Sequence, residues 1–192
     1  MYTNITLAGP DLSAVEELLR RAGRTAYVLV RPGFWVVYDK ASEQQDGTVE
    51  GLARQIAAGI GCSALAVTNH DDDVLIYRLF VGARETDSYN SRPGYWEWNG
   101  EGVEPGPAGG DSSALCAAFD RDGSQGSVDA VLTGAFDFEV ERHAALCRAL
   151  GLSGQAAGVG FTDASEGHVR LEQAGARLLV IGVAPCKPCS SQ

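Results

Sequence analysis

The sequence predicts an α+β protein: an antiparallel sheet built from three helix–strand–strand units, with the helices packed on one face. At three places an amphipathic stretch and a glycine precede two short apolar runs that are joined by a turn. Strands joined by short turns must be antiparallel. With 192 residues, the chain is expected to form a single α+β domain, 1–192, whose core needs no disulfide or metal.

The first unit follows the N-terminal residues. The segment DLSAVEELLRRAGR (11–24) places apolar residues at helical spacing. Ser13 and Glu16 fit a capping box, and Gly23 suits the end of the helix. The runs TAYVLV and FWVVYDK then flank the turn RPG. This pattern predicts a helix followed by a hairpin.

The second unit starts at Thr48. Apolar residues recur at helical spacing up to Gly61, which predicts a helix that ends there. The runs SALAVT (63–68) and VLIYRLFV (74–81) predict a second hairpin. Residues 83–89 are expected to add a third strand to it.

The third unit begins near Asp137 with a helix that Gly151 is expected to end. The runs AAGVGF (156–161) and HVRLEQ (168–173) are expected to be its two strands, and residues 178–183 a further strand. The three units share no clear sequence identity, so they indicate recurring architecture and not a repeat family.

One segment interrupts this layout. NGEGVEPGPAGGD (99–111) is rich in Gly, Pro and Glu and has almost nothing to bury, so we expect a flexible loop there. Two short helices are expected after it, at 112–119 and at 127–133, with Ser127 as the cap of the second.

The charge of the chain is concentrated in its middle. The net charge is −10, and residues 71–141 hold fifteen of the 25 acidic residues but only four arginines. Nucleic acid and anionic membranes are poor partners for such a surface. A basic protein or a cation is a better match, and a solvated acidic face that only keeps the protein soluble is the alternative.

Composition also indicates a compartment. We find no signal peptide in the first residues and no apolar run long enough to span a membrane. The five cysteines are an odd, scattered number, which predicts thiols in a reducing cytoplasm. Cys186 and Cys189 form a CxxC so close to the end of the sequence that we expect a frayed tail and assign the pair no role. Arginine far outnumbers lysine, which suggests a bacterial genome rich in G and C.

A first candidate site lies in TNHDDDVLIYRLF (68–80). Aspartates favour turns, so a hairpin turn explains their presence before the apolar run. The alternative is a divalent metal held by His70, Asp71 and Asp73, as in a metal-binding domain or a metal-dependent hydrolase. Both faces of the run are apolar except at Arg78, which is expected to pair with an aspartate of a neighbouring strand.

A second candidate site is the aromatic stretch before the acidic loop. Tyr and Trp are typical of binding hot spots, and nearby glutamates could match a basic partner. The alternative is that the rings fold onto the core. The predicted binding residues are Tyr95, Trp96, Trp98, Glu97, Glu101 and Glu104.

No catalytic motif is present: the chain has no GxSxG, HExxH, P-loop or GxGxxG. We therefore predict no catalytic residue and no cofactor. The function that these patterns favour is a non-enzymatic acidic interaction protein that binds a basic protein partner. An immunity-type inhibitor of a bacterial toxin is one instance of that class. A globular protein with no ligand site that the sequence reveals is a further alternative.

Overall fold

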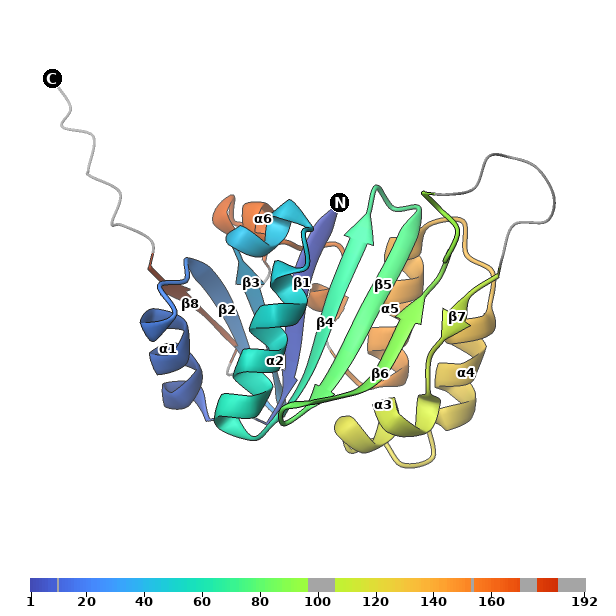
Figure 1. The fold of residues 1–192 in the computed structure, drawn as a ribbon, viewed down its shortest axis with the longest axis horizontal. Helices are drawn as coiled ribbons and strands as arrows, with labels where there is room; N and C mark the ends of the chain where they lie inside the picture. The colour runs from blue at the N-terminus through green and yellow to red at the C-terminus, as the bar shows by residue number, and fades with distance from the viewer. Residues whose placement is uncertain (10, 97–105, 153, 170–175, 183–192) are drawn as a thin grey trace, which may run out of the picture.

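The computed structural model describes residues 1–9, 11–96, 106–152, 154–169 and 176–182. It has one eight-stranded sheet with helices on both faces (Figure 1). The strands are β1 (Tyr2–Ala8), β2 (Ala26–Arg31), β3 (Phe34–Asp39), β4 (Ser63–His70), β5 (Val74–Val81), β6 (Arg84–Asn90), β7 (Ala108–Gly109) and β8 (Arg177–Ile181). The helices are α1 (Leu12–Arg21), α2 (Thr48–Ile60), α3 (Ser112–Ala118), α4 (Gln125–Thr133), α5 (Glu139–Ala149) and α6 (Phe161–Ser165), with 3-10 helices η1 (Ala41–Gln44) and η2 (Gly154–Ala156).

The strand order is β7-β6-β5-β4-β1-β3-β2-β8, and neighbouring strands are antiparallel. The α+β class, the first two helix–hairpin units, the third strand β6 and the further strand β8 are confirmed. The central strand β1 was not expected from the sequence. It lies between β3 and β4 and joins the two hairpins into one sheet.

The helices cover both faces of the sheet, whereas the sequence predicted one. The reason lies in β4 and β5, whose successive side chains are apolar in both directions. Ala66 and Phe80 pack in the core with α1 and α2. Leu65 and Tyr77 point the opposite way and pack with α3, α4 and α5. A sheet that is apolar on both faces needs a helical layer on each.

The third predicted hairpin is not present. Residues 156–161 and the described start of 168–173 form no strand, and α6 begins at Phe161, the last residue of the first range. One side chain favours a helix here instead of a strand. The Asp163 carboxylate accepts a 2.8 Å hydrogen bond from the Gly160 N–H and so caps the start of α6. Residues 170–173 lie outside the described part of the chain.

Two helix starts also differ from the expectation. Asp11, not Ser13, caps α1, because its carboxylate accepts a 2.9 Å bond from the Ser13 N–H. Helix α4 begins at Gln125, before the expected cap Ser127. Of the predicted loop 99–111, the described residues include β7, which pairs with β6.

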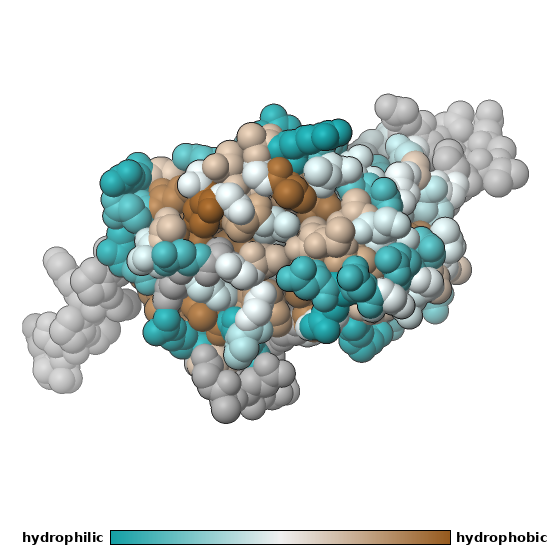
Figure 2. All heavy atoms as spheres, turned by 90° about the horizontal axis from the view of Figure 1, so that it is seen from below, coloured by the Kyte–Doolittle hydropathy of each residue, from teal (hydrophilic) through white to brown (hydrophobic). Residues whose placement is uncertain are grey.

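The face that carries α1 and α2 is only partly covered. Figure 1 shows both helices over the strands from β8 to β4. Helix α2 also contacts part of β5, including Phe80, and part of β6, while β7 and the rest of β5 and β6, with the adjoining end of β4, carry no described helix on that side. We call this uncovered surface the open half; it is formed by Thr68, Ile76, Arg78, Ser88 and Asn90. Seen from below, apolar atoms gather in the upper part of the view, on the side of α1 and α2 (Figure 2).

The described helices do not include one that is both long and apolar enough to cross a membrane.

Candidate functional site

The β4–β5 connection is a tight turn, as the aspartates predicted. Asp71 and Asp72 both have positive φ angles, of 50° and 65°. The Asp73 N–H donates a 3.0 Å hydrogen bond to the carbonyl of His70 and closes the turn. Asp and Asn adopt this left-handed backbone more readily than most residues, which explains the residue types without a ligand.

Asp72 joins this turn to helix α5. Its carboxylate accepts a 2.6 Å hydrogen bond from the Val140 N–H, and its carbonyl accepts a 3.0 Å bond from the Glu139 N–H. The N-cap residue of α5 is Phe138, whose side chain makes no capping bond. Asp72 therefore caps α5 from a distant part of the chain.

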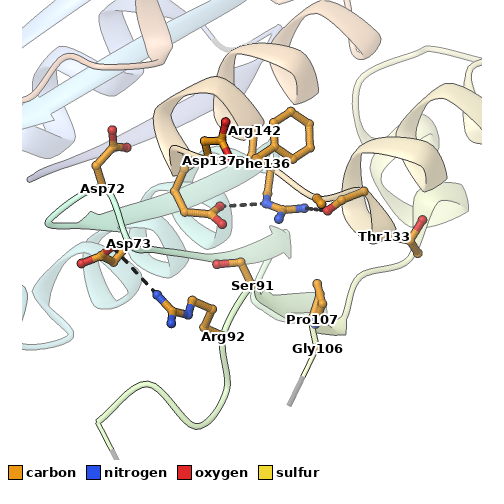
Figure 3. A pocket seen from close by; sticks show the side chains of 13 residues that line it. Asp72, Asp73, Ser91, Arg92, Gly106, Pro107, Thr133, Phe136, Asp137 and Arg142 are labelled. Atoms are coloured by element: carbon orange, nitrogen blue, oxygen red, sulfur yellow. Dashed lines mark hydrogen bonds and ion pairs between the residues drawn. The ribbon is translucent and has the colours of Figure 1, made fainter. Parts of the chain in front are cut away.

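Asp73 contacts the segment that follows β6. The Tyr95 hydroxyl donates to its carboxylate at 3.2 Å, and the Arg92 guanidinium lies 3.9 Å from the same group. Figure 3 shows Arg92 reaching toward Asp73. Arg92 also lies over the Tyr95 ring, 5.3 Å from its centroid. Desolvation and the hydrogen bond to Asp73 raise the pKa of Tyr95.

Three rings meet beside the turn. The Trp96 ring is 5.4 Å from that of His70 and 5.3 Å from that of Tyr95, measured between centroids. His70 is held from the other side by a 2.8 Å hydrogen bond between its Nδ1 and the Gln45 Oε1. Trp96 is nevertheless 59% exposed, so its ring does not fold onto the core.

The structure thus brings both candidate sites together. We call this cluster the hairpin rim; it comprises His70, Asp71, Asp73, Arg92, Tyr95 and Trp96. Among the predicted site residues, Glu97, Trp98, Glu101 and Glu104 lie outside the described part of the chain. Sequence reasoning missed Arg92, which only its position beside the aromatic stretch could have indicated.

The first of two cavities at the rim has a volume of about 390 Å³ and contains Arg142 (Figure 3). Arg142 is buried and bonds to the Glu139 carboxylate at 2.8 Å. It also donates to the carbonyls of Val131 and Gly134 at 2.8 and 2.9 Å. These bonds satisfy carbonyl groups at the C-terminal end of α4, so the guanidinium stabilises the connection between α4 and α5.

The second cavity, of about 380 Å³, lies between the start of α2, η1 and the end of the β4–β5 hairpin. We call it the Glu50 cavity; residues that line it include Gln44, Glu50, Thr68, His70, Ile76 and Trp96. The Glu50 Oε2 atom is buried and has no hydrogen-bond partner in the described structure. Sequence reasoning missed Glu50, because a glutamate in the first turn of a helix looks like an ordinary N-terminal residue.

The aspartates of the turn act separately and not as one ligand set. The described ranges contain no group of three His, Cys, Asp or Glu side chains that could hold a metal ion. The His70 Nε2 atom is 3.6 Å from the Asp71 carboxylate, while Asp73 is engaged by Tyr95 and Arg92.

His143 lies away from the rim on the opposite face of the sheet, within α5. Its Nδ1 atom shares a 2.8 Å hydrogen bond with the Tyr2 hydroxyl, and its Nε2 atom has no hydrogen-bond partner in the described structure. Burial lowers the pKa of His143 to about 4. The ring is therefore a neutral structural group at neutral pH.

Comparisons with protein-family models, with curated proteins and with solved structures found no match. A function must therefore be inferred from the geometry of the hairpin rim and its two cavities.

Proposed function

We propose that this chain is a non-enzymatic interaction protein whose hairpin rim binds a basic protein partner in the cytoplasm. The observation that carries the proposal is the exposed Trp96 ring, which packs against His70 and Tyr95, the two residues that contact the Asp71 and Asp73 carboxylates. The side chains of Asp71 and Asp73 are 56% and 54% exposed. An immunity-type inhibitor of a bacterial toxin remains one instance of this class.

The aromatic part supports a role in binding a protein. Large, rigid aromatic side chains contribute much contact area and lose little conformational entropy on binding. Trp96 has this character because two neighbouring rings support it while its own surface stays exposed. Such residues dominate measured binding energies at protein interfaces.

The charge supports a basic partner. Arg92 already places a guanidinium over the Tyr95 ring and near the Asp73 carboxylate. The rim therefore combines a ring and a carboxylate in the arrangement that a cationic side chain prefers. The excess of acidic residues between 71 and 141 would further attract a basic partner from a distance.

The test uses a short peptide rich in Arg and Lys, labelled with a fluorophore, and its Glu-substituted counterpart. Binding to the full chain is followed by fluorescence anisotropy. We expect the basic peptide alone to bind, with weaker affinity as the salt concentration rises. Trp96→Ala should weaken binding by about tenfold or more, as for a hot-spot residue.

The matched control is Asp129→Asn, which removes one exposed acidic side chain from α4, outside the rim. The double variant Asp71→Asn and Asp73→Asn should weaken binding, while Asp129→Asn should leave it nearly unchanged. Equal affinity of the wild type and Trp96→Ala for the basic peptide would refute the proposal.

A further inference from the structure

Glu50 lines the Glu50 cavity, and its carboxylate makes no hydrogen bond or ion pair in the described structure. Glu50 belongs to the first turn of α2, and its Oε2 atom is buried without a hydrogen-bond partner in the described structure. A buried polar atom without a partner destabilises the folded state. Because Oε2 is out of reach of a water-sized molecule, a donor that enters the cavity would meet the Glu50 carboxylate at its other oxygen, Oε1.

The other walls of the cavity limit the kind of donor. Trp96 and His70 contribute aromatic rings, Ile76 contributes an apolar side, and Gln44 and Thr68 contribute polar groups. The described residues that line the cavity include no lysine or arginine side chain, although Met1, which carries the N-terminal ammonium group, also lines it. A carboxylate beside a Trp ring is the arrangement that binds an ammonium or guanidinium group.

We infer that the Glu50 cavity binds one basic side chain of the partner, an arginine or a lysine, with its cationic group paired to Glu50 and its stem against Trp96. The inference rests on the proposed function and names the chemistry by which the partner is recognised. The cavity volume of about 380 Å³ is sufficient for a long basic side chain.

Trp96 connects this cavity with the exposed rim. It lines the cavity, packs against the His70 ring in a tilted arrangement and is still 59% exposed. A partner could therefore cover the rim and insert one side chain behind it. In this arrangement Asp71 and Asp73 attract the partner, while Glu50 selects one residue of it.

The experiment titrates the full chain with three probes: Nα-acetyl-arginine amide, Nα-acetyl-lysine amide and the neutral isostere Nα-acetyl-citrulline amide. Binding is followed by the NMR shift of the Trp96 indole N–H, which Trp96→Phe identifies by its loss. We expect one or both cationic probes to shift this signal, and the citrulline probe to leave it unchanged. The probe that binds more tightly identifies the basic side chain.

Glu50→Gln is the decisive variant, because it removes the charge and keeps the shape. We expect it to weaken the cationic probe by about tenfold or more, the effect of losing a charged hydrogen-bond partner. Trp96→Ala, followed through neighbouring backbone signals, should weaken it by about threefold. Glu17→Gln, which changes an exposed glutamate of α1, should have no effect.

Two outcomes would overturn the inference without deciding the proposed function. One is equal affinity of a cationic probe for the wild type and for Glu50→Gln, which would place the cation elsewhere on the rim. The other is no binding of either cationic probe to the wild type. The peptide titration with Trp96→Ala tests the proposed function independently of both.

Discussion

The two halves of the sheet face that carries α1 and α2 differ sharply. In the covered half, the side chains under the helices are apolar and fully buried, as for Leu7, Val37 and Phe80. In the open half, the same face of β5 and β6 presents Ile76, Arg78 and other partly exposed side chains. One sheet is thus used for stability on one side and is available for contacts on the other.

The border between the halves is where α2 begins. The Glu50 cavity lies there, with Glu50 from the helix and Thr68 and His70 from the adjacent strand. A binding site at such a border has rigid, packed residues behind it and solvent in front. The proposed contact surface therefore falls on the open half and its border, and not on the helix-covered half.

The largest expected effect separates the halves by stability. Leu7→Ala in the covered half should lower the free energy of unfolding by about 3 kcal/mol, because it leaves a cavity in a closed core. Ile76→Ala in the open half should lower it by about 1 kcal/mol, because that site is already partly open to water. Urea denaturation measures both values, and similar losses would remove the distinction.

His143, on the opposite face of the sheet, should make the stability of the protein depend on pH. The folded-state pKa of His143 is lowered to about 4 by burial, while an unfolded chain gives a value near 6.5. The unfolded state therefore binds more protons below pH 6.5, so stability should fall as pH decreases from about 6.5 to about 4, by at most about 3 kcal/mol.

Urea midpoints at several pH values test this prediction. His143→Gln should flatten the decline over that range, and His168→Gln, at an exposed site, should leave it as in the wild type. A slope that is the same in all three proteins would show that His143 does not contribute.

A smaller effect is expected at the turn that borders the open half. Asp72→Ala should lower the free energy of unfolding by about 1–2 kcal/mol more than Asp71→Ala, because only Asp72 caps α5. Both residues have positive φ, where alanine is disfavoured, and Asn69→Ala serves as a second control because its side chain also donates to the Asp72 carboxylate, at 3.0 Å. Thermal or urea unfolding gives the difference, which should vanish if the cap is unimportant.

The smallest expected effect concerns divalent metals at the rim. A metal at about 100 times its dissociation constant would stabilise the protein by roughly 2.7 kcal/mol. Because the turn aspartates are engaged separately, we expect no change of the melting temperature between Mg²⁺, Ca²⁺, Mn²⁺ and chelator. A clear shift that Asp71→Asn abolishes would instead favour the metal-binding alternative for His70, Asp71 and Asp73.

Much of the fold was predictable because local patterns determine it. The spacing of apolar residues and the glycines at helix ends predicted α1, α2 and their hairpins, since neighbouring residues determine each of these elements. Strand β1 was not predicted, because its polar residues Thr3, Asn4 and Thr6 interrupt the apolar pattern that indicates a buried strand. Asn4 is accommodated by a hydrogen bond to the carbonyl of Val159, far along the chain.

For the candidate sites, too, the sequence predicted what local patterns determine and missed contacts between distant segments. Residue type and proximity in sequence pointed to Tyr95, Trp96 and the turn aspartates, which the structure brings together. Arg78 was expected to pair with an aspartate and pairs instead with Glu85 on β6, at 2.6 Å. Glu50 lines a cavity only because α2 packs beside β4, and no local sequence pattern predicts that contact.

The central position of β1 has a consequence for how the chain folds. Its residues pair on one side with β3 and on the other with β4; Ile5, for example, lies between Val37 and Ala66. The inner strand of each hairpin, β3 or β4, gains its second neighbour only when β1 pairs with it. Such long-range pairing is slow and strongly coupled, so the two hairpins should be lost in one cooperative transition and not one after the other.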